Sequence, residues 1–188
     1  TQVDKQSQPK LSPGKKSRLT ESLEAFDKAI ELRGEMADAH YGRGTVLQEL
    51  ERHDEAVAAF DQALKLDPEI EGAAFAKGNS LSEKGKYEEA ETSYRSGLEK
   101  FPNEALAHYN LGFVLDEQGK TEEARKSYLK AIELDNNIAG AHNNLGVILN
   151  QEDNTEDAVK SFITAVEKSP EYAAAHYNLG SAYLKLGK

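Results

Sequence analysis

Four histidines recur at one position of a 34-residue period, and histidine is the side chain here best suited to bind a metal or transfer a proton. Metal ligands must lie within about 2 Å of the ion, whereas equivalent positions in stacked helical hairpins lie on the order of 10 Å apart. The sequence therefore predicts no metal site and assigns these histidines to packing between helices. They are His40, His108, His142 and His176.

Other arrangements typical of catalysis are also missing from the sequence. No serine lies in a glycine-rich turn between a strand and a helix, and no glycine loop suits a phosphate. The chain has no cysteine, which excludes thiol catalysis, disulfides and thiolate metal sites. We therefore predict no catalytic residues, no cofactor and no enzymatic activity.

Charge and hydropathy limit the classes of partner that this chain could bind. The net charge is −10, with +4 in residues 1–18 and −14 in the rest. An acidic body argues against nucleic acid as the main partner, and no apolar run approaches the ~20 residues of a membrane span. Because the chain begins at Thr1 without an apolar signal core, we expect a processed product or a piece of a longer protein. We expect it to be soluble and intracellular, in the cytoplasm or an organelle interior, although the compartment itself is not identified.

The glycines provide the main structural signal, because five of them lie 34 residues apart without a slip. Each of the first four is followed by alanine after 12 residues, an aromatic residue after 16 and a small residue after 19. Small residues permit two helices to approach closely, and one aromatic ring per repeat fills the space between them. Proline 24 residues after three of the glycines ends a helix there. The five glycines are Gly44, Gly78, Gly112, Gly146 and Gly180.

This pattern resembles the tetratricopeptide repeat, in which each 34-residue unit is a hairpin of a first and a second helix. Residues 107–112 and 175–180 (AHYNLG) are similar to its first helix, and residues 85–90 (GKYEEA) to its second. The resemblance implies an all-α fold, a right-handed superhelical solenoid with about four full repeats and a half repeat at each end. The repeats are expected at 37–70, 71–104, 105–138 and 139–172, with half repeats at 17–36 and 173–188 of a solenoid over 17–188.

Both ends of this stack are expected to be unusual. Residues 1–16 form a basic tail that we expect to be disordered, either as a solvated arm, the remnant of a targeting segment or a small docking arm. A lone second helix is expected at 18–32, and a lone first helix ends the chain. Terminal units of a solenoid need polar caps, and neither end supplies one. Either the chain is part of a longer array or another subunit covers its ends.

By resemblance, the first helices line the concave groove of the solenoid, with groove positions six, three and two residues before each glycine and one, four and five after it. An aromatic residue stands three before most glycines, and asparagine stands two before the last three. An amide can bind both the N–H and the C=O of an extended peptide, as in the asparagine ladder of O-linked N-acetylglucosamine transferases, which this run is similar to. The alternative is that the asparagines bond within the groove wall or to water. The candidate groove residues are Tyr41, Phe75, Asn79, Tyr109, Asn110, Asn143, Asn144, Tyr177 and Asn178.

The charged residues at the groove positions are mainly acidic, namely Asp38, Glu49, Glu83, Asp116 and Glu117, with Lys185 the one basic residue among them. A carboxylate clamp for acidic chaperone tails needs basic residues there, so an extended neutral to basic segment is the better match. The leading hypothesis is a non-catalytic scaffold that binds such a segment of a partner protein. A second is a structural subunit or assembly factor of a larger multiprotein complex, docked through its uncapped ends or by end-to-end association. A third is the substrate-selecting region of a longer enzyme such as a glycosyltransferase.

Overall fold

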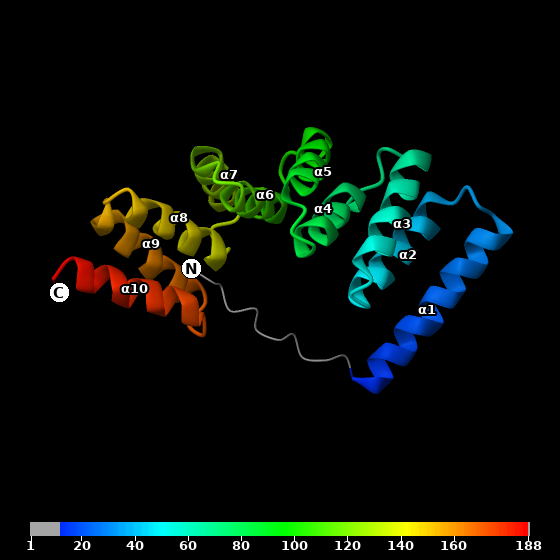
Figure 1. Ribbon diagram of the computed structural model, residues 1–188, viewed down its shortest axis with the longest axis horizontal. Helices are drawn as coiled ribbons and strands as arrows, with labels where there is room; N and C mark the ends of the chain where they lie inside the picture. Colours follow the sequence, from blue (N-terminus) through cyan, green and yellow to red (C-terminus); the bar gives the residue numbers. More distant parts are fainter. Residues whose placement is uncertain (1–11, 188) are drawn as a thin grey trace. The chain divides into compact units, whose positions relative to one another are not determined.

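The computed structural model describes residues 12–187, and within this range it contains helices and turns without strands (Figure 1). No helix in that range is long and apolar enough to cross a membrane. The helices are α1 (Pro13–Leu32), α2 (Ala37–Glu49), α3 (His53–Leu66), α4 (Ala73–Glu83), α5 (Tyr87–Lys100), α6 (Ala105–Glu117), α7 (Thr121–Leu134), α8 (Ala139–Gln151), α9 (Thr155–Lys168) and α10 (Ala173–Lys185). The fold is therefore all-α, as the sequence predicts.

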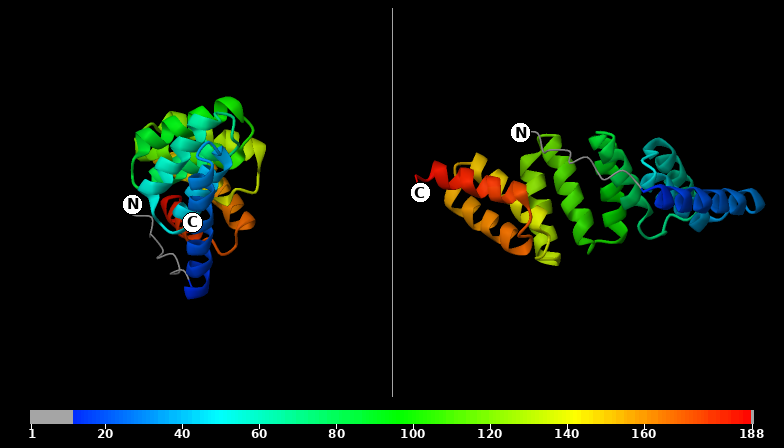
Figure 2. Two further views of the ribbon diagram at one scale, coloured as in Figure 1. Left: turned by 90° about the vertical axis from the view of Figure 1, so that its right-hand side faces the viewer. Right: turned by 90° about the horizontal axis from the view of Figure 1, so that it is seen from below.

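The chain divides into two compact units, one ending at Phe101 and the other beginning at Pro102. In the first unit, α2 pairs with α3 and α4 with α5, while α1 packs on α2. In the second unit, α6 pairs with α7 and α8 with α9, and α10 lies against α8 and α9 (Figures 1 and 2). Each complete hairpin thus joins a first helix, of even number, to a second helix, of odd number.

A glycine in each first helix faces an aromatic ring in the second helix of the same hairpin. A Cβ atom placed on any of these glycines would lie 2.6–2.8 Å from a ring atom, which is too close for any larger residue. The rings themselves are at most 1% exposed. The pairs are Gly44 with Phe60, Gly78 with Tyr94, Gly112 with Tyr128 and Gly146 with Phe162.

The turns inside the hairpins share one left-handed backbone position, 34 residues apart. Glycine holds it in two hairpin turns, with φ of 71° at Gly85 and 74° at Gly119, and Gly187 after α10 has the same conformation with φ of 71°. Glu51 (φ 59°) and Asp153 (φ 62°) adopt the same conformation with a side chain attached. Because a Cβ atom disfavours this region, these two turns are strained relative to the glycine turns.

The first described helix differs from the expectation of a disordered tail over residues 1–16. Helix α1 begins at Pro13, because the side chain of Ser12 accepts a hydrogen bond from the Lys15 amide at 3.3 Å. Proline is compatible with a first helical turn, where its missing N–H has no partner to lose. Lys15 also pairs with Glu49 of α2 at 2.8 Å. The remainder of the expected tail, residues 1–11, lies outside the described residues.

Candidate binding surface

The four equivalent histidines form hydrogen bonds to the turns between repeats. In each case the ring Nε2 lies within hydrogen-bonding distance of the carbonyl six residues earlier, so Nε2 carries the proton and donates it. This bond fixes the start of a first helix relative to the end of the preceding repeat. The pairs are His40 with Gly34 (3.0 Å), His108 with Pro102 (2.9 Å), His142 with Asn136 (3.2 Å) and His176 with Pro170 (2.8 Å). Among the described residues, no group of three or more histidine, cysteine or acidic side chains could hold a metal ion.

One repeat has Ala74 in place of this histidine, and the carbonyl at the equivalent turn position receives its hydrogen bond from another residue. The ammonium of Lys100, at the end of α5, donates to the carbonyl oxygen of Pro68. It also pairs with Glu69 at 2.6 Å. The turn therefore keeps its hydrogen bond although its donor comes from a different helix.

The aromatic residues of the predicted groove are mostly packing residues. Tyr41 stacks against Phe60 with ring centroids 5.9 Å apart, and Tyr109 stacks against Tyr128 at 6.1 Å. Phe75 occupies the equivalent position but contacts a different ring, that of Phe101, with centroids 6.4 Å apart. Tyr41, Phe75 and Tyr109 are all half-buried.

Two small residues make room for the tyrosine hydroxyls. A Cβ atom on Gly140 would lie 2.6 Å from the hydroxyl oxygen of Tyr109, and one on Gly72 would lie 2.9 Å from that of Tyr41. Burial raises the pKa of Tyr109, with a smaller contribution from Tyr172, so its hydroxyl stays protonated at neutral pH. These tyrosines therefore join one repeat to the next.

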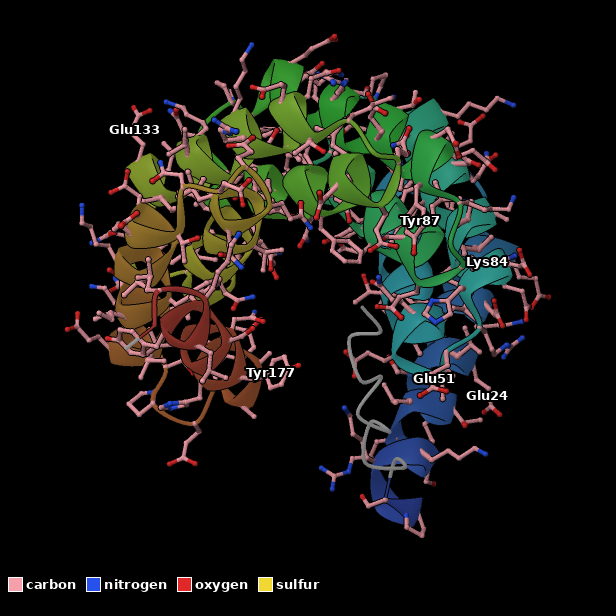
Figure 3. All side chains as sticks on the ribbon, turned by 60° about the vertical axis from the view of Figure 1, so that its left-hand side comes forward. Glu24, Glu51, Lys84, Tyr87, Glu133 and Tyr177 are labelled. Carbon is pink, nitrogen blue, oxygen red and sulfur yellow. The ribbon has the colours of Figure 1, made fainter. Side chains whose placement is uncertain are left out.

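Tyr177 differs from the other residues of this aromatic column, because its side chain is 72% exposed. Figure 3 shows it projecting from α10 into open space. Tyrosine at an exposed position offers both a ring face and a hydroxyl to a partner. Of the aromatic residues predicted for the groove, Tyr177 is the one whose ring is available for contact.

The asparagines of the second unit form a hydrogen-bonded chain across three helices. Asn178 of α10 donates from Nδ2 to the Oδ1 of Asn143 in α8, at 2.9 Å. Asn143 donates to the Oδ1 of Asn144 at 3.1 Å, and Asn144 donates to the hydroxyl of Tyr128 in α7 at 3.2 Å. The ring of Tyr128 is completely buried, and desolvation raises the pKa of its hydroxyl. The amide of Asn144 therefore provides a partner that this buried hydroxyl needs.

These bonds decide which of the predicted amides face outward. Asn143 is 4% exposed and acts inside the wall. Asn110, Asn144 and Asn178 are half-buried, and the Oδ1 of Asn178 accepts no hydrogen bond from the described residues. In the first unit, the Oδ1 of Asn79 accepts from the hydroxyl of Tyr94 at 2.6 Å. The wall thus uses part of the hydrogen-bonding capacity of these asparagines, which is the alternative role considered for them.

An exposed leucine completes this surface, although the predicted groove residues, which are all aromatic or asparagine, do not include it. Leu106 is 64% exposed in the first turn of α6. It precedes Asn110 by four residues, so both lie on one face of the helix. Its position six residues before Gly112 is a groove position, and attention to apolar residues there could have found it. We refer to Leu106, Asn110, Asn144, Tyr177 and Asn178 as the amide face of the second unit.

Charges around the amide face are negative. Asp116 and Glu117 lie at the end of α6, and burial followed by repulsion from Glu117 raises the pKa of Asp116. Lys185, the basic residue of the groove positions, is held by Asp153 at 2.7 Å and by the carbonyl of Asn150 at 2.9 Å. Because Lys185 is already paired, it leaves little positive charge to attract an acidic ligand.

Comparison with known proteins is consistent with this repeat architecture. Family models described as tetratricopeptide repeat match residues 37–70, 75–137 and 127–160, and one described as TPR repeat matches residues 148–187. No curated protein matches the chain.

Several solved structures share the fold. The crystal structure of YrrB, described as a TPR protein with an unusual peptide-binding site, is 30% identical, with a TM-score of 0.75 over 88% of this chain and 85% of that one. A MamA crystal structure is 20% identical, with a TM-score of 0.78 over 87% of this chain and 98% of that one. MamA from Desulfovibrio magneticus RS-1, from residue 41 to its end, is 25% identical, with a TM-score of 0.76 over 84% and 89%.

Proposed function

This chain belongs to the tetratricopeptide repeat family, and from that premise we propose that it is a non-catalytic scaffold whose amide face binds an extended segment of a partner protein. The family and its solved members support a role in protein interaction. The extended form of the ligand, its charge and the residues that bind it are parts of this proposal.

The observation that carries the proposal is the row of half-buried amides at one position of three successive first helices. Asn110, Asn144 and Asn178 recur at 34-residue intervals on α6, α8 and α10. Equivalent positions in stacked hairpins lie ~10 Å apart, which corresponds to about three residues of extended chain. A single peptide could therefore meet successive amides while keeping one backbone conformation.

Asn178 retains hydrogen-bonding capacity toward a ligand. Its Nδ2 is anchored on Asn143, while its Oδ1 accepts no bond from the described residues. The anchored amide has a fixed orientation, so it loses little conformational entropy when it accepts a peptide N–H. The adjacent ring of Tyr177 offers an apolar contact beside it.

Electrostatics favour a neutral or basic ligand. Glu117 is exposed and lies five residues after Gly112, while Lys185 is paired with Asp153. An acidic peptide would meet repulsion from the carboxylates, and a basic one would meet attraction that weakens with salt. The peptide-binding description of YrrB, which is 30% identical, supports a peptide as the ligand class.

Selection of displayed random peptides on the immobilised full chain tests this function. We expect the enriched peptides to be more basic than the starting library and to lose affinity when Glu117→Lys reverses a charge near the amide face. Glu133→Lys makes the same change at an exposed position of the second helix α7 and is the control (Figure 3). Enrichment of acidic peptides, or equal effects of the two substitutions, would contradict the proposed ligand.

A further inference from the structure

The first helices of the second unit, α6, α8 and α10, follow one another side by side. A Cβ atom on Gly140 of α8 would lie 2.6 Å from the hydroxyl oxygen of Tyr109 in α6, and Asn178 of α10 donates to Asn143 of α8 at 2.9 Å. Each contact joins the N-terminal halves of two neighbouring helices. Equivalent residues of successive first helices are therefore about 10 Å apart, one helix diameter, and the amides at positions 110, 144 and 178 form a row with this spacing.

The spacing of the amide row matches one extended conformation better than another. A polyproline-II segment has three residues per turn and rises about 3.1 Å per residue, so every third residue faces the same way after about 9 Å. A β-strand repeats its orientation every second residue, or about every 6.6 Å, and its third residue faces the opposite way. A polyproline-II backbone also has no internal hydrogen bonds, so its N–H and C=O groups are available to the amides.

Two amides of the row can accept a backbone N–H. The Nδ2 of Asn178 is bound to Asn143, while its Oδ1 accepts no hydrogen bond from residues 12–187. Asn144 donates one N–H to Tyr128 at 3.2 Å and accepts one bond from Asn143 at 3.1 Å. Because a primary amide has two N–H donors and two oxygen lone pairs, Asn144 keeps one of each. A peptide residue that binds the oxygen of either amide needs an N–H, which proline lacks.

Helix α6 presents different chemistry on the two sides of this row. Leu106, Asn110 and Glu117 are separated by four and seven residues, so they share one face of the helix. Leu106 is 64% exposed in the first turn, about 6 Å along the axis from Asn110. Glu117 is exposed at the last residue, about 10 Å from Asn110 in the other direction, and Asp116 is half-buried beside it. A segment lying on Asn110 thus has an apolar residue on one side and carboxylates on the other.

We propose that the segment bound by the amide face is a polyproline-II helix in register with the repeats, which specifies the ligand further and rests on the proposed function. One residue in three turns its backbone N–H toward an asparagine of the row. The three side-chain directions of this helix are about 120° apart, so one points toward the first turns, one toward the last turns and one away from the protein. Leu106 favours an apolar side chain in the first direction, and Glu117 favours lysine or arginine in the second.

This geometry predicts the composition of the partner segment. The segment has an apolar residue and a basic residue where it crosses α6, and proline is compatible with the positions whose N–H faces away from the row. Proline there fixes φ near the polyproline-II value in the free peptide, so less conformational entropy is lost on binding. The residue before each proline is also confined to the extended region, which the bound conformation already requires.

Proline scanning of a peptide selected on the full chain tests the proposal. Each residue of the peptide is replaced in turn by proline and, as the matched control, by alanine, and fluorescence anisotropy gives the Kd of each peptide. We expect proline to raise Kd about fivefold or more relative to alanine at positions three residues apart, where it removes an N–H that the amides bind. At the intervening positions the two substitutions should give Kd values within about twofold of each other, because a polyproline-II backbone accommodates proline.

Two variants of the chain assign the register. In Asn178→Ala the proline effect should disappear at one sensitive position and persist at the others, whereas Asn103→Ala, in the exposed turn before α6, should leave all of them unchanged. Proline sensitivity at every second position or at every position would overturn the proposal, as would a pattern that Asn178→Ala leaves intact. So would the absence of any sensitive position from a peptide that Asn178→Ala still weakens. A selected peptide whose Kd is unchanged by Asn178→Ala would instead contradict the proposed binding at the amide face, and this inference with it.

Discussion

The Nδ2 of Asn144 lies 3.2 Å from the hydroxyl oxygen of Tyr128, and the equivalent residues of the next repeat, Asn178 and Phe162, cannot form this bond. In the latter repeat the amide is instead anchored on Asn143 at 2.9 Å. The two asparagines therefore differ in what they bind. The amide of Asn144 satisfies the buried hydroxyl of Tyr128, whereas Phe162 has no hydroxyl and the Oδ1 of Asn178 accepts no bond from the described residues.

The first prediction concerns this hydrogen bond. Asn144→Ala should lower the free energy of unfolding by about 1–3 kcal/mol, because it leaves the buried Tyr128 hydroxyl without this partner. In a Tyr128→Phe background the same substitution should cost much less. Urea denaturation of the four proteins of this double-mutant cycle measures the coupling. Additive effects would show that the bond does not stabilise the fold.

Substitution by alanine should change stability in opposite directions at two glycines that share one repeat position. Gly112→Ala should destabilise the chain by about 1–3 kcal/mol, since the new Cβ would lie 2.7 Å from the ring of Tyr128. Gly180→Ala meets open space and should stabilise α10 by up to about 1 kcal/mol through helix propensity. Thermal or urea unfolding compares the two variants. An equal loss of stability in the two variants would contradict this steric explanation.

Backbone strain at Glu51, in the turn between α2 and α3, gives a third prediction. Glu51→Gly should raise the free energy of unfolding by about 0.5–1 kcal/mol, because Glu51 is left-handed with φ of 59° and glycine removes the Cβ penalty. Gly119→Ala is the reciprocal control, since it adds a Cβ atom to the same turn position at φ of 74°. Stabilisation by both substitutions, measured by urea denaturation, would rule out this explanation.

Acid sensitivity should arise in part from His142. Burial lowers the pKa of this histidine, and the nearby ammonium of Lys168 acts in the same direction, against the hydrogen bond to Asn136. The unfolded chain, with an ordinary histidine pKa of about 6.5, therefore binds a proton more readily than the folded chain. The stability that this difference contributes is complete above pH ~6.5 and is lost as the pH falls through the lower folded pKa.

The pH dependence can be measured by urea denaturation at pH 7.5 and 5.5. The free energy of unfolding should fall between these values, and the fall should be smaller in His142→Gln, which cannot titrate. An equal fall in both proteins would exclude His142 as a source of the acid sensitivity.

The helical repeat could be predicted from the sequence, because the residues at which two helices touch recur at fixed positions of the repeat. A glycine at 112 and a ring at 128 define where two helices cross, whatever the intervening residues are. Helix stops are equally local, since Pro68 and Pro102 directly follow the capping residues of α3 and α5. The start of α1 was misjudged because Pro13 can begin a helix as well as interrupt one, and the hydrogen bond from the Lys15 amide to Ser12 decides between them.

The binding surface was less predictable, because hydrogen bonds between repeats depend on side-chain geometry. Periodicity placed Asn143 and Asn144 beside each other in the groove, but it could not indicate that Asn143 is buried. The same periodicity grouped Tyr109 with Tyr177, although the first packs on Tyr128 and the second is exposed. Exposure along a column depends on the neighbours of each ring, and a repeat pattern alone does not report them.

The central claim is that the amide face binds an extended peptide backbone, and the affinity of one selected peptide for two single variants tests it most directly. Asn178→Ala removes an amide whose Oδ1 accepts no bond from residues 12–187. Asn103→Ala removes an exposed amide in the turn before α6 and is the control. We expect fluorescence anisotropy to show a roughly fivefold or greater rise in Kd for Asn178→Ala, equivalent to a lost hydrogen bond of about 1 kcal/mol, and an unchanged Kd for Asn103→Ala. An unchanged Kd for Asn178→Ala, with helicity retained, would contradict the account.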